Sequence, residues 1–178
     1  MKHAKARTVA ALALVLLASG CSQPKEEKRA FEVPDSLCGT PVPAELLSPV
    51  LPASGTKIEE ERKPGKGYFS CRVVVDGTTV LTADWNWTEK GRTPRSVAYD
   101  NPYLDIAEHE GGGGKYVYSS TGGVSRVTCD PVVAHRKGKY ELFARVFVSD
   151  GEKSAPAMEK LITTYAEALS ASSECEQK

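Results

Sequence analysis

The sequence predicts an α+β domain in which an antiparallel β-sheet built from hairpins is covered by a C-terminal amphipathic helix. Two observations carry this prediction. Apolar and polar residues alternate on both sides of Asp76-Gly77, a dipeptide that strongly favours a two-residue hairpin turn. Near the end of the chain, apolar residues instead recur at helical spacing. Strands gathered into hairpins and followed by one long helix are typical of this fold class.

The first hairpin is expected to pair residues 69–75 with residues 78–87. A two-residue turn places Val73 opposite Val80, Cys71 opposite Thr82 and, on the other face of the sheet, Tyr68 opposite Trp85.

The remaining elements are predicted from turn and cap residues. A short helix follows Pro43, a charged stretch without an assigned strand covers residues 57–66, and a second short helix follows Asn101 over 103–110. Residues 111–114 are four glycines and form a loop. A second hairpin pairs 115–120 with 124–129, and a third pairs 132–135 with 140–149. In the longest arm, Leu142, Ala144, Val146 and Val148 share one face, and Phe143 and Phe147 share the other.

The predicted C-terminal helix begins after Ser154, which is a good N-cap residue, and has Pro156 in its first turn. Its apolar stripe consists of Met158, Leu161, Ile162, Tyr165, Ala168 and Leu169. Such a stripe must cover another apolar surface, and the sheet is the only large candidate. Continuing the stripe past Ser172 directs Cys175 toward the sheet.

Residues 1–20 are expected to form a signal peptide. Lys2, Lys5 and Arg7 precede ten apolar residues that end at Ala18. A helix needs about 20 apolar residues to cross a bilayer, so this run is too short to span one. A basic start, a short apolar run and small residues before the cut are typical of secretory signals.

The residues at the end of this segment, Ala18-Ser19-Gly20-Cys21, resemble the lipobox of bacterial lipoproteins, although that motif prefers Leu where Ala18 stands. The resemblance implies that a diacylglyceryl group is attached to the Cys21 thiol and that the leader is cut before this residue. Two acyl chains hold a protein stably on a membrane. The expected location is therefore the extracytoplasmic face of the bacterial cell membrane. The alternative is an ordinary signal peptide with a chance cysteine.

Charge and composition divide the rest of the chain. Removal of residues 1–20, which carry three basic and no acidic side chains, leaves 20 basic and 23 acidic side chains and a net charge of −3. This balance argues against nucleic acid as a partner, because nucleic-acid-binding proteins present a basic face. Residues 21–35 offer little to bury, so a flexible tether is expected there. Residues 36–178 then form a single disulfide-stapled globular domain of ordinary length.

The four cysteines of this domain are expected to form two disulfides, because an even set in an exported protein indicates disulfides. None belongs to a C-x-x-C pair, so neither a metal site nor a cofactor is expected. Cys71 points to the inward face of its strand and can receive Cys38, and Cys175 faces the sheet near Cys129. These disulfides close loops of 33 and 46 residues. Loop closure stabilises the folded state by about 3.7 and about 4 kcal/mol, respectively. Crossed pairs would stabilise the fold by only a few tenths of a kcal/mol more. Loop entropy alone therefore does not decide between the pairings.

Three features together resemble small secreted lipoproteins of actinobacteria whose function is unassigned. They are the opening Cys38-Gly39-Thr40-Pro41, the central strand with Cys71, and the terminal helix that ends in Cys175. The resemblance covers most of the chain after the leader and implies no catalytic residues.

No catalytic motif is recognisable in the sequence. A G-x-S-x-G nucleophile elbow is absent. His109 stands between Glu108 and Glu110, which on a helix point in different directions, and His135 lies near a predicted turn, so both are expected on the surface. The run of glycines from Gly111 is followed by a strand pattern instead of the helix that a phosphate loop requires.

One aromatic cluster is a candidate binding patch. Trp85 and Trp87 are two residues apart and project from one face of their strand, with Tyr68 opposite Trp85. A flat row of aromatic rings offers a stacking surface for sugars or aromatic ligands. The alternative is that the rings belong to the core, as aromatic residues in strands usually do.

These features lead to the expectation of a cell-envelope lipoprotein. Its domain would act as a non-enzymatic binding module for an envelope protein, a glycan or a small ligand, and the lipid on Cys21 would hold it to the membrane. The alternative is a small envelope hydrolase whose site is built from scattered residues. The absence of paired nucleophile and base signals favours the binding module.

Overall fold

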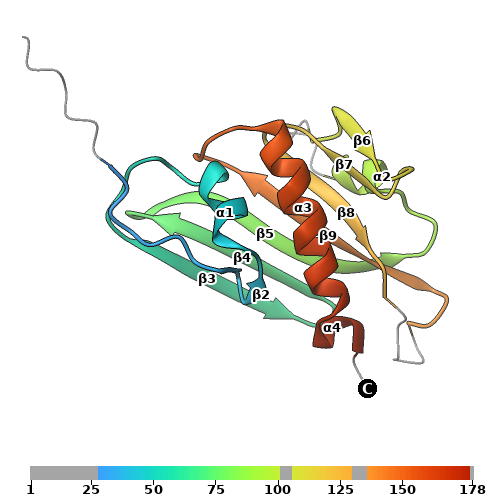
Figure 1. Ribbon diagram of the computed structural model, residues 1–178. Helices are drawn as coiled ribbons and strands as arrows, with labels where there is room; N and C mark the ends of the chain where they lie inside the picture. The colour runs from blue at the N-terminus through green and yellow to red at the C-terminus, as the bar shows by residue number, and fades with distance from the viewer. Residues whose placement is uncertain (1–27, 101–105, 130–135, 177–178) are drawn as a thin grey trace, which may run out of the picture.

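The computed structural model of the chain describes residues 28–100, 106–129 and 136–176. A seven-stranded antiparallel sheet has the order β3-β4-β5-β9-β8-β7-β6, and the short ribbon β1-β2 lies in front of it with the helix α3 (Figure 1). The predicted α+β fold is confirmed. The elements are β1 (Ser36–Leu37), β2 (Thr40–Pro41), α1 (Ala44–Leu47), the 3₁₀ turn η1 (Ser48–Val50), β3 (Ile58–Gly65), β4 (Tyr68–Val75), β5 (Thr78–Glu89), α2 (Pro94–Ala98), β6 (His109–Gly111), β7 (Tyr116–Tyr118), β8 (Gly122–Val127), β9 (Tyr140–Val148), α3 (Ala155–Ser170) and α4 (Ser173–Glu176).

Helix α3 crosses the front of the sheet, with α1 beside it (Figure 1). Ser154 caps α3 as predicted, because its Oγ accepts a hydrogen bond from the Ala157 amide at 3.4 Å. Met158, Leu161, Ile162, Tyr165 and Leu169 are buried as predicted, and Ala166 takes the place expected for Ala168. This stripe packs in one core with the predicted inward residues of β9, Leu142, Ala144, Val146 and Val148.

The opposite face of β9 carries a second core. Phe143 and Phe147 pack there with Val97 and Ala98 of α2, a helix that was not predicted. Thr93 begins α2 with a reciprocal cap: its Oγ1 accepts from the Ser96 amide at 3.1 Å, and Ser96 Oγ accepts from the Thr93 amide at 3.0 Å. A Thr cap followed by Pro94 at the first helical position is a local signal that could have revealed this helix.

The prediction of a helix over 103–110 is wrong for the residues that the structure describes. Residues 101–105 lie outside the described part of the chain, and His109–Gly111 forms strand β6. The glycines after it adopt positive φ angles of 60° to 83°, which only glycine adopts freely. This tight turn folds β6 back on β7, so the backbone amides pair across a hairpin. The predicted arm 132–135 also lies outside the described residues.

The register of the first hairpin differs from the prediction beyond its turn. Val74 pairs with Thr79 as a two-residue turn demands, but Val73 pairs with Leu81, so Val80 is the extra residue of a β-bulge. Every pair beyond the bulge is therefore shifted by one: Cys71 faces Ala83, Phe69 faces Trp85 and Tyr68 faces Asn86. A shift of one residue on one strand reverses which side chains share a face.

Two regions that were expected to lack regular structure are ordered. The charged stretch 57–66 contains β3, an edge strand whose exposed charges protect it from further pairing. The tether was expected to extend to residue 35, but Phe31 is only 8% exposed and belongs to the core. Arg29 donates hydrogen bonds to Ser48, Leu51 and Pro52 at 2.8–3.0 Å. The packed segment thus begins at or before Arg29, because its guanidinium satisfies the carbonyl groups that follow α1.

Among the described helices, none is both long and apolar enough to cross a membrane.

Candidate functional site

The three aromatic residues of the predicted patch do not form one surface. Trp85 is 7% exposed and stacks on Phe69, with ring centroids 5.9 Å apart, so it belongs to the core beneath α3. Tyr68 is 53% exposed and lies on the opposite face of the sheet. The patch prediction is therefore wrong for Tyr68 and Trp85. The bulge at Val80 is the physical reason, because it turns the face with Trp85 inward.

Trp87 is only partly buried, on the same face of β5 as Trp85 and at the end of the sheet where α4 lies. Its amide donates to the Gly67 carbonyl at 2.9 Å, which ties β5 to the turn between β3 and β4. The guanidinium of Arg136 lies over the indole ring, 4.9 Å from its centroid. Gly67, at φ 81°, leaves room for that guanidinium, because a Cβ there would be 3.2 Å from Arg136 Nη2. The positive φ favours glycine at this turn, and the missing side chain leaves Arg136 more room.

Two cavities border Trp87, and both are lined by Trp87 and Tyr140. One has a volume of about 240 Å³ and is completed by Lys66, Gly67 and Arg136. The other has a volume of about 210 Å³, and its lining combines apolar Val127, Cys129 and Leu142 with polar Arg126, Thr128 and Glu141. We call these two spaces the sheet-end cleft. The first cavity is basic, and the second mixes apolar side chains with a pair of opposite charges.

Three polar atoms of residues that line the sheet-end cleft have no hydrogen-bond partner among the described residues. They are Nε1 of Trp87, Nη1 of Arg136 and Nε of Arg126, and all three are closed off from solvent. An unsatisfied buried donor costs about 1–3 kcal/mol. The acid near Arg136 is Glu174 of α4: burial raises the pKa of Glu174, and the Arg136 charge opposes that shift.

Lys66, Arg136 and Tyr140 were not singled out from the sequence. They belong to or adjoin turns that are far apart along the chain, and no periodic pattern brings such turns together. The one local signal was the basic turn that begins at Arg136 and continues through Lys137-Gly138. Trp87 was found because strand alternation places it two residues from Trp85.

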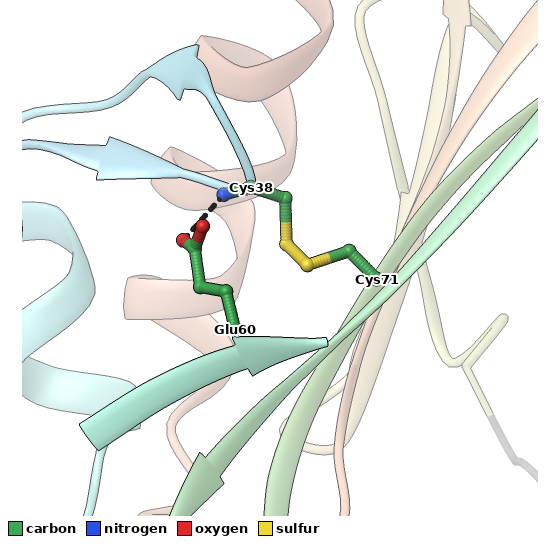
Figure 2. Close-up of side chains that lie close together, drawn as sticks. All are labelled: Cys38, Glu60 and Cys71. Carbon is green, nitrogen blue, oxygen red and sulfur yellow. Dashed lines mark hydrogen bonds between the residues drawn. A yellow bond between two sulfur atoms is a disulfide. The ribbon is translucent and has the colours of Figure 1, made fainter. Parts of the chain in front are cut away.

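Both predicted disulfides are present. Cys38 and Cys71 are joined with their Cα atoms 6.0 Å apart, and Cys129 and Cys175 with theirs 5.1 Å apart. Cys38 sits in the turn of the β1-β2 ribbon with φ 58°, followed by Gly39 at φ 85°. Figure 2 shows that this turn holds Cys38 directly above the strand that carries Cys71. The first disulfide therefore fastens the N-terminal ribbon to the sheet.

Glu60 of β3 lies beside this disulfide (Figure 2). Its Oε1 accepts a hydrogen bond from the Cys38 amide at 2.7 Å, and its Oε2 accepts one from Arg62 Nε at 3.1 Å. Glu60 and the two sulfurs gather within 4.8 Å, a separation at which they could share a metal ion. The sulfurs are bonded to each other and offer no thiolate, and the carboxylate already has two partners. This cluster is best explained as support for the ribbon.

His109 has no catalytic surroundings among the described residues. Its Nε2 is 3.9 Å from a Glu108 oxygen, its ring lies 5.1 Å from that of Tyr118, and its side chain is 47% exposed. These contacts include no serine or cysteine nucleophile, so the hydrolase alternative gains no support from His109. His135 and Cys21 lie outside the described residues.

A second polar cluster lies on the face of the sheet away from α3. Arg145 Nε donates a hydrogen bond to Asp84 Oδ1, and the Asp84 side chain is 11% exposed. Burial raises the pKa of Asp84, and the neighbouring Arg145 limits the rise. On the same strand, Asn86 Oδ1 and Thr88 Oγ1 are buried without a partner among the described residues. Asp84 and Arg145 thus compensate each other's charge.

The chain was compared with protein families, curated proteins and solved structures. No protein-family model, no curated protein and no solved structure matches the chain. The function must therefore be argued from the residues themselves.

Proposed function

We propose that this chain is a lipid-anchored binding module of the bacterial cell envelope, and that its ligand occupies the sheet-end cleft. The observation that carries the proposal is the position of Trp87. Of the three aromatic residues of the predicted patch, Trp87 is the one that lines the two cavities of the sheet-end cleft. Small-ligand sites are concave and combine aromatic walls with a few directed polar groups.

The anchor supports the envelope half of this proposal. Cys21 follows small residues at the end of a short apolar run, in a context that resembles a lipobox. The folded body begins by residue 29, so only a few residues separate it from the proposed lipid. A span of about seven residues reaches at most about 25 Å. The folded body would therefore sit close to the membrane surface, with the cleft at the far end of β3 from Ala30, which donates to the Gly55 carbonyl just before that strand.

The anchor is tested by feeding cells an alkyne-tagged fatty acid and detecting the tag on the isolated protein. The wild-type chain is expected to carry the tag and to enter the membrane pellet. Cys21→Ser is expected to lose the tag, whereas Ser22→Ala, one residue further on, is expected to keep it. Equal labelling of the wild type and Cys21→Ser would refute lipidation at this residue.

Ligand binding is tested by the fluorescence of Trp87. Trp85→Phe keeps an aromatic ring on Phe69 and leaves Trp87 as the only indole, since the sequence has two tryptophans. Soluble muropeptides and short peptides are expected to shift its emission in a saturable manner. The matched control is Trp87→Phe, in which the buried Trp85 should not respond. If Trp85 responds and Trp87 does not, the ligand binds elsewhere and the cleft is the wrong site.

A further inference from the structure

We infer that the sheet-end cleft takes a small oxyanion, a carboxylate or a phosphate, carried on an apolar body. This inference rests on the proposed function and adds the chemical class of the ligand. It starts from the unpartnered donors of the stacked pair Trp87 and Arg136. Trp87 Nε1 and Arg136 Nη1 are both N–H groups, and neither has an acceptor among the described residues. A ligand that supplies acceptor oxygens would satisfy such donors.

The charges of the first cavity favour an anion over a neutral acceptor. Lys66 and Arg136 line it, and its described lining residues include no carboxylate. Glu174 of α4 interacts with Arg136, and the described lining offers Lys66 no acid. Hydrogen bonds to charged groups are about twice as strong as neutral ones.

The position of Arg136 suits it to grip an oxyanion. A guanidinium that stacks on an indole keeps its N–H groups in the plane of the stack, where they are free to donate. Nη1 of Arg136 has no hydrogen-bond partner among the described residues, so it has no bond to break first. The indole N–H of Trp87, whose ring centroid is 4.9 Å from the Arg136 guanidinium carbon, is a second unpartnered donor of the same stack.

The second cavity determines what the oxyanion is attached to. Trp87 and Tyr140 line both spaces, so a ligand held by Arg136 extends past these rings toward Val127 and Leu142. Arg126 and Glu141 of that cavity compensate each other's charge at 3.6 Å, although Nε of Arg126 has no hydrogen-bond partner among the described residues. The body of the ligand is therefore expected to be apolar or flat.

The test follows the indole N–H signals by ¹⁵N–¹H NMR in the full chain, purified in a non-ionic detergent. Trp85→Phe identifies which of the two signals belongs to Trp87. Benzoate is the first probe, benzamide is its neutral match, and glycerol phosphate represents a phospholipid headgroup. Sodium chloride at equal ionic strength is the reference. Benzoate is expected to move the Trp87 signal saturably and to leave the Trp85 signal in place.

Variants assign the contacts. Arg136→Gln is expected to weaken benzoate binding about tenfold, because a charge-assisted hydrogen bond is lost. Lys66→Met, which removes an exposed charge, is expected to weaken it about threefold. The matched control is Arg72→Gln, since Arg72 is an exposed arginine of β4 that pairs with Glu61 at 3.6 Å. Arg72→Gln should bind benzoate like the wild type.

The outcomes separate this inference from the proposed function. Equal shifts with benzoate and benzamide would overturn the oxyanion but leave a binding cleft. The oxyanion would also be overturned, and the binding cleft kept, if neither benzoate nor glycerol phosphate moves the Trp87 NMR signal while muropeptides still change Trp87 emission. A shift with glycerol phosphate alone would support the oxyanion and assign it to a headgroup. Benzoate binding that survives Arg136→Gln unchanged would refute the inference, and silence of Trp87 toward every probe would refute both proposals.

Discussion

The two faces of the seven-stranded sheet use alternate residues of the same strands but are covered in different ways. The front face is one continuous apolar core beneath α3, and both disulfides close its margins. The back face has an apolar half, where the short helix α2 covers Phe143 and Phe147, and a polar half around Asp84. The front face is thus suited to hold the fold together. The back face holds less apolar surface and carries buried charge instead.

The cleft lies where the front face ends. Trp87 follows Trp85 on the same side of β5, but it lies beyond the cover that buries Trp85, next to the turn that contains Arg136. A core face that runs past its covering helix leaves an aromatic wall exposed at its margin. The proposed binding surface is therefore a part of the core face that α3 leaves uncovered, and Arg126 and Glu141 border it at the strand ends.

The contrast between the two faces can be tested by mutation. The largest expected loss of stability comes from removing the disulfides of the front face. Replacing both Cys129 and Cys175 with Ala should lower the free energy of unfolding by about 4 kcal/mol, because a loop of 46 residues is no longer closed in the unfolded chain. Replacing Cys38 and Cys71 should cost about 3.7 kcal/mol for a loop of 33 residues. Urea titrations measure both. A loss below about 1 kcal/mol for either pair would show that the front face does not depend on that closure.

Truncation of one buried side chain on each covering helix compares the two faces directly. Leu161 of α3 is fully buried, so Leu161→Ala should cost about 3 kcal/mol. Val97 of α2 is 1% exposed, and Val97→Ala should cost about 1.6 kcal/mol because it removes only two carbon groups. Thermal and urea unfolding give both values. Equal losses would mean that the short helix is as important to the fold as the long one.

The sequence was sufficient to predict the parts of the fold that depend on local residue patterns. Alternation along 140–148 correctly separated Leu142 and Ala144 from Phe143, and the stripe of α3 correctly directed Cys175 inward. Strand β3 was missed because it is an edge strand, and its charged residues replace the apolar alternation that identifies a strand.

The register error and the patch error have one cause, the extra residue Val80. The adjacent apolar pair Val80-Leu81 interrupts the alternation, and Leu81, Ala83 and Trp85 then alternate cleanly with polar neighbours. That pattern contained the signal for a bulge. No such signal exists for the cleft, because Lys66, Trp87 and Arg136 meet only through tertiary folding. The sequence therefore predicted Trp87 as part of the proposed site but not its basic residues, Lys66 and Arg136.

The polar half of the back face is tested by Asp84→Asn. The change leaves Arg145 without its charged partner, and the expected loss is about 2 kcal/mol, the value of a hydrogen bond to a charged group. The matched control is Glu61→Gln, which removes the partner of Arg72 on the same sheet, where both side chains are 43% or more exposed. Its expected loss is below about 0.5 kcal/mol. Similar losses in the two variants would show that burial of the Asp84–Arg145 pair contributes nothing.

The smallest expected effect is a pair of opposite pH dependences on the back face. Burial raises the pKa of Asp84 above its ordinary value of 3.8, whereas the hydrogen bond from Arg92 lowers the pKa of Asp100 below 3.8. Between 3.8 and its folded pKa, Asp84 binds more protons in the folded state, so its contribution to stability falls as the pH rises through that window. Asp100 binds fewer protons in the folded state just below 3.8. Its contribution is complete above 3.8 and is lost as the pH falls through its folded pKa.

Carboxyl ¹³C NMR titration of the wild type measures both pKa values. Arg92→Gln should return the pKa of Asp100 toward 3.8 and leave that of Asp84 raised, because Arg92 is not among the groups that shift Asp84. In urea titrations, Asp84→Asn should flatten the decline in stability above pH 3.8, and the slope is the quantity to compare, since this variant also loses stability at every pH. If Asp84 titrates at or below 3.8, its attraction to Arg145 outweighs its burial. The back face would then be stabilised by its ion pair, and the difference drawn between the two faces would disappear at this residue.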